Sequence, residues 1–189
     1  NGDKVIAVTK DDDTLIVNKN VNVEINEEAI NNQNDESDKP ERTIILGWNK
    51  QAYTIIREIN NYSADGSEIK IVSSYKITDE EQSDIKVLAD KIKIDFQTAD
   101  TTSRAVIDSL GIATYDHILL LSYKDELELQ KADSVTLITL LHLRRVSEEA
   151  GKNINIVSEM LDVHNRELAE VTKADDFIVS DKIISLLMT

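Results

Sequence analysis

Apolar and polar residues follow two different periods along this chain, and the pattern predicts its secondary structure. After Pro40, short apolar runs are separated by stretches in which apolar residues recur every three or four positions. Short apolar runs bounded by turn residues are typical of buried strands, and the longer spacing is typical of helices with one buried face. Strands are therefore expected at 42–46, 69–74, 92–96, 117–122, 153–158 and 176–180.

Four of the expected strands, IILG, IKIVSS, HILLLS and INIVSE, are almost continuously apolar and end in small or polar residues. Strands that are buried on both faces of a parallel sheet have this composition. Helical patterns lie between them, around 52–59, 106–110, 125–149 and 162–172. The alternation predicts the α/β class: a Rossmann-like, doubly wound, mostly parallel sheet with helices on both faces. Ligands of such sheets bind at the carboxyl ends of the strands.

The residues before Pro40 follow a different pattern. Two short β-rich runs, 4–9 and 14–18, are joined by Asp11, Asp12 and Asp13, which predicts a short β-hairpin. Residues 24–40 are polar, lack periodicity and hold the only proline, so they are interpreted as a linker. The domain over 41–189 stops inside a helical pattern, and it is expected to be truncated at its C-terminus.

The three aspartates of the expected hairpin raise the question of a cation site. A calcium loop of the EF-hand type that starts at Asp11 needs glycine at its sixth position and glutamate at its twelfth. Ile16 and Asn22 stand at these positions. A solvated turn is the favoured interpretation, and Asp11, Asp12 and Asp13 are candidate ligands for a low-affinity cation site only.

The first strand is followed by the turn Gly47-Trp48-Asn49-Lys50-Gln51-Ala52. A dinucleotide-binding loop has glycine at the positions of Gly47 and Asn49, and the second glycine allows the backbone to approach the pyrophosphate. The Asn49 side chain occupies that space. The second strand ends in Ser73-Ser74 without the carboxylate that holds a ribose. Tight NAD binding is therefore not expected, and a turn retained for folding, with another ligand or none, is favoured.

Other polar residues follow the fourth and fifth strands. Ser122 and Tyr123 come directly after the fourth strand, and Glu159 follows the fifth. Glu159 is equally suited to bind ribose hydroxyls or a cation and to cap the helix after it. The candidate ligand-binding residues are thus Gly47, Trp48, Asn49, Ser73, Ser122, Tyr123 and Glu159. The sequence contains no catalytic motif, and its three histidines lack the spacing of a zinc site.

The amino-acid composition argues against several classes of binding partner. The net charge is -15, from 36 acidic against 21 basic residues, which argues against nucleic acid and against anionic membrane surfaces. The chain has no cysteine, so disulfides and thiolate metal sites are excluded. No run approaches the roughly 18 apolar residues that a membrane span needs. The fragment itself is expected to be soluble, without direct membrane insertion.

The longest expected helix carries apolar residues in most directions around its axis. A helix that covers a sheet needs one apolar stripe, so a second apolar face must contact another domain, another subunit or the rest of its own chain. Val135, Ile138, Leu140 and Leu143 are predicted to form an association surface. Leu140 and Leu143 are the chosen pair, because residues three apart lie on one side of a helix.

Several segments together resemble the cytoplasmic part of the Castor/Pollux-type ion channels, which belong with the proteins that carry RCK domains (regulators of potassium conductance). The segments are GDKVIAVTKDDDT, ILGWN, YDHILLLS and INIVSEMLDVHNRELAEVTKADDFIVSDKIISLLM. The resemblance implies a non-enzymatic gating-ring domain on the cytoplasmic side of a membrane, in an integral membrane protein whose pore is covalently linked. It implies a homo-oligomer, with dimers within the ring, and it identifies residues 1–23 as the tail of a preceding regulatory domain.

In the wider RCK group the strand-end edge binds nucleotides or cations such as calcium, so the resemblance implies a ligand of one of these kinds that is coupled to pore opening. Two alternatives remain. One is a nucleotide-sensing subunit of a potassium uptake transporter, with the same fold and a separate pore. The other is a Rossmann-fold NAD-dependent oxidoreductase, against which the incomplete glycine loop and the missing ribose carboxylate argue.

Overall fold

The structure is a computed structural model that describes residues 39–151, 154–162, 165 and 176–179. The chain divides into two units, and all the described residues belong to the second, Asp35–Thr189. The expected hairpin, the candidate ligands Asp11, Asp12 and Asp13, and most of the linker and of the expected helix over 162–172 lie outside the described residues.

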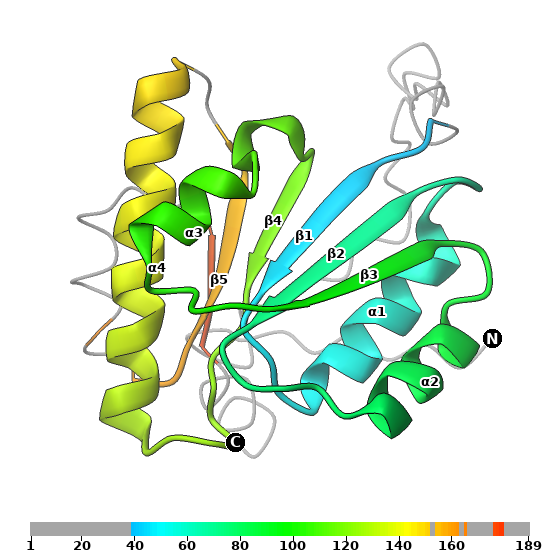
Figure 1. The fold of residues 1–189 in the computed structure, drawn as a ribbon, viewed down its shortest axis with the longest axis horizontal. Helices are drawn as coiled ribbons and strands as arrows, with labels where there is room; N and C mark the ends of the chain where they lie inside the picture. The colour runs from blue at the N-terminus through cyan, green and yellow to red at the C-terminus, as the bar shows by residue number, and fades with distance from the viewer. Residues whose placement is uncertain (1–38, 152–153, 163–164, 166–175, 180–189) are drawn as a thin grey trace, which may run out of the picture. The chain divides into compact units, whose positions relative to one another are not determined.

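The described strands form one sheet of six parallel strands in the order β3-β2-β1-β4-β5-β6 (Figure 1). Each lies within a few residues of its predicted position: β1 Arg42–Leu46, β2 Glu68–Ser73, β3 Lys93–Thr98, β4 His117–Leu120, β5 Ile156–Met160 and β6 Asp176–Val179. The strand order reverses between β1 and β4, which is the topological switch point of a doubly wound sheet. The predicted Rossmann-like fold is confirmed.

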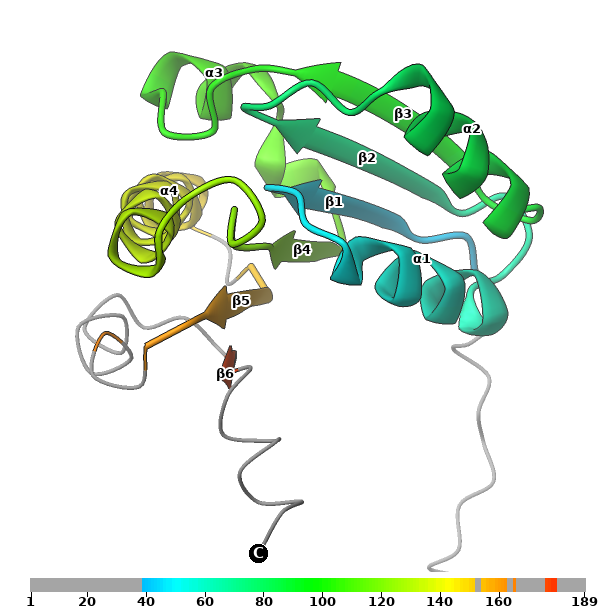
Figure 2. The ribbon, with the colours of Figure 1, turned by 90° about the horizontal axis from the view of Figure 1, so that it is seen from below.

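Helices cover the two faces of this sheet (Figure 2). They are α1 Gln51–Tyr62, α2 Asp79–Leu88, α3 Arg104–Ser109 and α4 Leu129–Ala150, with a short 3₁₀ helix, η3, at Ile112–Thr114. Successive residues of β1 point to opposite faces. Ile44 belongs to an apolar cluster with α3 and α4, whereas Ile45 belongs to a second cluster with α1 and α2. Both residues are fully buried, as expected for a central parallel strand.

The sequence pattern did not reveal α2. Its only fully buried residue is Ile85, so its apolar periodicity is faint. The helix is instead marked at its start by a capping box: the Thr78 side chain accepts from the Glu81 amide, and the Glu81 carboxylate accepts from the Thr78 amide. Three acidic residues in the first turn add favourable charge at the positive end of the helix dipole.

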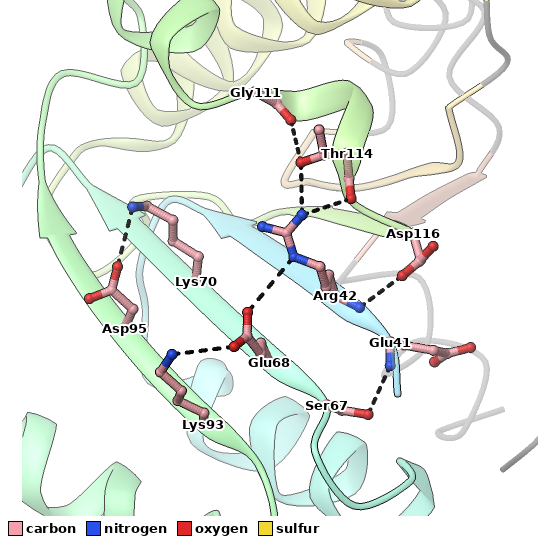
Figure 3. A network of polar contacts seen from close by, with 10 residues as sticks. All are labelled: Glu41, Arg42, Ser67, Glu68, Lys70, Lys93, Asp95, Gly111, Thr114 and Asp116. Carbon is pink, nitrogen blue, oxygen red and sulfur yellow. Dashed lines mark hydrogen bonds and ion pairs between the residues drawn. The ribbon is translucent and has the colours of Figure 1, made fainter. Parts of the chain in front are cut away.

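Part of the α3/α4 side of the sheet is covered by ion pairs instead of a described helix (Figure 3). Glu68 on β2 pairs with Arg42 on β1 at 3.8 Å and with Lys93 on β3 at 3.3 Å. Two residues further along β2 and β3, Lys70 and Asp95 pair at 3.2 Å. Most of these side chains are about half exposed or more, so β2 and β3 alternate between charged, solvated positions and buried apolar ones.

The facing of α4 corrects one sequence prediction. Leu140 and Leu143 are 1% and 0% exposed and belong to the core under this helix, so their choice as association residues was wrong. Two buried threonines, Thr136 and Thr139, share the sheet-facing side, and each hydroxyl donates to a backbone carbonyl one helical turn back. Because polar residues occupy buried positions, the apolar pattern alone misplaced the buried stripe. The exposed large apolar residues of α4 are Leu129, Ile138 and Leu141, and Val135 is partly buried.

Candidate functional site

The candidate site lies at the switch point, where the turn after β1 meets the residues after β4. Gly47 has a φ of 94°, and its amide donates to the Val72 carbonyl at 2.9 Å. A Cβ atom on Gly47 would lie 1.9 Å from the Leu121 carbonyl oxygen. The glycine is therefore required by the close approach of the chain leaving β4, independently of any phosphate.

Doubly wound sheets bind dinucleotides in the crevice at the switch point, and Asn49 lies at this position in the fold. Its side chain is buried, and its amide nitrogen donates to the Ser122 carbonyl at 2.7 Å and to Glu159 Oε2 at 2.8 Å. Its Oδ1 accepts from the Gln51 amide at 2.9 Å. One side chain thus joins the β1 turn to the ends of β4 and β5.

Glu159 is the charged centre of the site. It is 5% exposed, and its carboxylate accepts from the Ser122 amide at 3.1 Å and pairs with Lys124 Nζ at 2.7 Å. A buried carboxylate needs such partners, because removal of its charge from water is costly. The sequence offered two roles for Glu159, ligand binding and helix capping. The structure adds a third role, in which Glu159 holds the strand ends together.

The first amides of α1 already have acceptors within the chain. The Lys50 amide donates to Asp125 Oδ2 at 2.8 Å, the Gln51 amide to the Asn49 side chain, and the Ala52 amide to the Asn49 carbonyl at 3.0 Å. Free amides at this end of a helix are what binds a phosphate group. In this structure the Asp125 carboxylate and the Asn49 side-chain oxygen accept from these amides, where a phosphate would otherwise bind.

A second polar cluster lies at the tips of β2, β3 and β4. The buried Tyr123 hydroxyl accepts from the Ser74 amide at 2.8 Å and lies 3.1 Å from Thr101 Oγ1. The Thr101 carbonyl in turn accepts from Thr139 of α4 at 3.1 Å. Next to this cluster, hydrogen bonds from the side chain and the backbone of Thr102 lower the pKa of Asp100.

The structure brings Asn49, Ser122 and Glu159 together, and it places Tyr123 in the second cluster. Ser73, beside that cluster, accepts from the Tyr75 amide at 3.1 Å. Trp48 does not contribute to either cluster, because it packs edge-on against Tyr53 among the apolar residues under α1.

Sequence reasoning did not assign roles to Lys124, Asp125, Thr101 or Asp133. Asp133 carried a signal that could have been used, since an aspartate stands there on the sheet-facing stripe of an amphipathic helix. Its carboxylate is fully buried and accepts from the amides of Leu161 and Asp162.

An apolar cleft lies at the opposite end of the strands, near the start of β1 and β4. Its volume is about 340 Å³, and it is lined by Ile59 and Tyr62 of α1 together with Leu119 and Val157. His117 lies at its rim, 3.3 Å from Glu41, an ion pair when the histidine is protonated. Within the described part of the chain, no three His, Cys, Asp or Glu side chains gather as metal ligands do. No described helix is both long and apolar enough to cross a membrane.

The sheet order defines a Rossmann-like fold, and solved RCK and TrkA-N structures share it. The TrkA-N domain of the Escherichia coli inner membrane protein ybaL superposes with a TM-score of 0.55 at 7% identity, over 80% of this chain and 96% of that one. The NAD(P)-binding domain of an exopolyphosphatase-related protein from Archaeoglobus fulgidus gives 0.54 at 18% identity, over 78% and 94%. The NAD-bound GsuK channel gives 0.51 at 16% identity, over 75% and 22%.

In sequence, the chain is homologous to the plant Castor/Pollux ion channels, which confirms the resemblance seen in its motifs. It is 24% identical over 221 residues to the probable ion channel POLLUX of Oryza sativa subsp. japonica, with 99% of this chain and 23% of that protein covered. The probable ion channel CASTOR of the same plant is 23% identical over 224 residues, with 99% and 24% covered. The chain spans about a quarter of the length of these relatives. No family model matches it.

Proposed function

We propose that this chain is a non-enzymatic regulatory domain of a cation channel, one unit of a cytoplasmic gating ring linked covalently to a membrane pore. The observation that carries the proposal is the similarity to Castor/Pollux ion channels over 99% of the chain, in a domain whose fold is that of RCK domains. Two further proposals concern the ligand and the ring contact.

The ligand site of this proposal is the Asn49–Glu159 crevice. A ligand that reaches the Glu159 carboxylate, either a cation or a ribose hydroxyl, competes with the partners that this carboxylate already has, among them Lys124 and Asn49. The domain then has two bonding states, and a ligand that favours one of them shifts the population of the ring. A nucleotide held through the α1 amides is disfavoured, since Asn49 and Asp125 occupy them.

The test uses the full-length protein that carries this chain, reconstituted in liposomes loaded with potassium. We expect potassium flux that changes on addition of calcium or ADP, and we expect Glu159→Gln to weaken that response while the flux persists. Glu58→Gln, at an exposed position on α1, is the matched control. Absence of flux under every condition, or reduction of NAD by the isolated chain, would overturn the proposal.

The similarity to a TrkA-N domain supports one alternative, a nucleotide-sensing subunit whose pore is a separate chain. The liposome experiment distinguishes the two proposals by the proteins that flux requires. A channel domain supports flux without any added protein, whereas a transporter subunit changes flux only when a separate pore protein is present.

For the ring contact, we propose that α4 associates with a second copy through Ile138 and Leu141. Their side chains are 43% and 56% exposed and lie three residues apart on the outer side of the helix. This contact replaces the pair Leu140 and Leu143, which the core already uses.

A further inference from the structure

Asp133 stands in an unusual environment for a carboxylate. It lies in the second turn of α4 and is fully buried. Its oxygens accept from the Leu161 amide, the Asp162 amide and the Asn165 side-chain amide, each at 2.9 Å. Three neutral donors at this distance offset part of the cost of burying the charge. These hydrogen bonds hold α4 to the loop after β5. Loss of the carboxylate would leave these partly buried donors without an acceptor, which is costly.

That loop begins two residues beyond Glu159. The Glu159 carboxylate bonds to Asn49 at 2.8 Å, and Asn49 bonds to the first turn of α1. A continuous series of short hydrogen bonds and two residues of backbone therefore runs from α1, through the switch-point crevice, to α4. Any change that moves the end of β5 moves the donors that Asp133 holds.

A second connection lies on the other side of the switch point. The Thr139 hydroxyl shares its single proton between the Val135 carbonyl of its own helix at 2.9 Å and the Thr101 carbonyl at 3.1 Å. Thr101 contacts the Tyr123 hydroxyl at the tip of β4. Thr139 is six residues beyond Asp133, which corresponds to about 9 Å along a helix. The helix is thus attached to the strand ends at two points, one toward β5 and one toward β2, β3 and β4.

We propose that Asp133 is a positioning residue that couples the state of the Glu159 crevice to α4. When Glu159 changes partner, the end of β5 shifts, and Asp133 transfers the shift to the helix that carries Ile138 and Leu141. Thr139 holds the same helix to the other strand tips, so the response is a tilt about that point. The inference rests on the proposed function in taking Glu159 as the ligand site and α4 as a contact between copies.

Hydrogen exchange followed by mass spectrometry on the 189-residue chain tests the coupling. Glu159→Gln keeps the size of the side chain and removes its charge. We expect amide exchange in residues 129–136 of α4 to accelerate about five-fold or more, because Asp133 in this segment holds the loop that follows Glu159. Asp133→Asn should accelerate exchange in the turn 49–52 to a similar degree. Ser134→Ala, at the exposed neighbouring position, should change neither segment.

Acceleration confined to residues 156–162 in Glu159→Gln would overturn the coupling, since a merely local role predicts that result. If Asp133→Asn does not fold, the Glu159→Gln experiment still decides the question by itself. Failure of this coupling leaves the liposome flux unaffected, and failure of the channel proposal leaves the exchange result intact, so the two outcomes are distinguishable.

Discussion

Gly47 has the most restrictive backbone position in the site, because a positive φ and a close carbonyl coincide there. With φ at 94° and the Leu121 oxygen 1.9 Å from the place that an added Cβ would take, Gly47→Ala must separate β1 from the exit of β4. We expect a loss of stability on the order of 3 kcal/mol, since strained backbone positions cost roughly 1–3 kcal/mol before any clash is counted. Urea unfolding followed by circular dichroism measures it.

The matched control is Gly151→Ala at the end of α4. Gly151 also has a positive φ, 60°, but no atom lies within 4 Å of the added Cβ. Its cost should be about 1–2 kcal/mol, from the left-handed backbone alone. Equal losses for the two variants would show that the contact with Leu121 does not matter.

Asp100 provides a pH-dependent prediction. The Thr102 side chain, more than the Thr102 amide, lowers the pKa of this carboxyl. A lowered pKa in the folded state stabilises the protein above the unfolded pKa, and this stabilisation is lost as pH falls through the folded pKa. Thr102→Val should raise the pKa of Asp100 part of the way to its ordinary value, because the backbone hydrogen bond remains. Carboxyl NMR titration measures this, and an unchanged midpoint would contradict it.

At the scale of single residues, the sequence predicted which residue types depart from a known motif better than it predicted their hydrogen-bond partners. The departure of Asn49 from the dinucleotide pattern was visible as a residue type in a known turn. Its bond to Glu159 was not, because that partner lies 110 residues away and depends on the strand order. Lys124 and Asp125 were missed for the same reason, since a charged residue after a strand has many possible partners until the fold brings one of them near.

At the scale of elements, the cap of α2 carries a prediction. Thr78→Ala removes the hydroxyl that accepts from Glu81 and leaves a helix with a single fully buried residue. We expect a loss of about 1 kcal/mol in urea unfolding. Ser83→Ala, within the same helix and on its exposed side, should change stability by less than half as much. A neutral Thr78→Ala would show that packing alone sets the start of this helix.

The exposed stripe of α4 carries the second element prediction. Ile138→Asp with Leu141→Asp should leave the circular dichroism spectrum unchanged and convert a dimer or larger species to monomer in sedimentation. Ile138 and Leu141 are 43% and 56% exposed, so burial of the exposed part contributes about half of the roughly 1.5–3 kcal/mol of a full burial, enough to decide a weak association.

Leu140→Asp is the contrasting variant. It places a charge in the core and should unfold the domain without reporting on association. A wild-type chain that is already monomeric at high micromolar concentration would contradict the contact.

Strands were easier to predict than helices here. Continuous apolar runs such as IILG mark central strands, because both faces of such strands are buried. Helix α2 buries little and was invisible to periodicity. The facing of α4 was misjudged because Thr136 and Thr139 have backbone carbonyls as acceptors for their hydroxyls and therefore occupy buried positions as apolar residues do.

For the whole molecule, the central prediction concerns NAD. The occupied α1 amides and the missing carboxylate at the tip of β2 predict no binding of NAD or NADH in the low micromolar range. Titration calorimetry at millimolar ligand measures this, and a low micromolar dissociation constant would contradict it.

Asp125→Ala with Asn49→Gly is the informative companion variant. These changes remove the side chains that accept from the Lys50 and Gln51 amides. We expect this double variant to bind ADP or NAD more tightly than the unchanged chain. A control with Glu126→Ala, at an exposed neighbouring position, should leave affinity unchanged.

The span of the Asn49–Glu159 bond has a consequence for synthesis. A ribosome that adds residues from the N-terminus delivers β1 and its turn well before β5. Until β4 and α4 emerge, the edge of β1 that will pair with β4 has no partner from the chain, and the apolar residues of β1 that face α4 stay uncovered. The Asn49 side-chain amide gains the Ser122 carbonyl after β4 and Glu159 only after β5. The nascent half-domain, β1 to β3 with α1 and α2, is therefore the species that chaperones meet. The crevice is completed in one late step, when the end of β5 arrives.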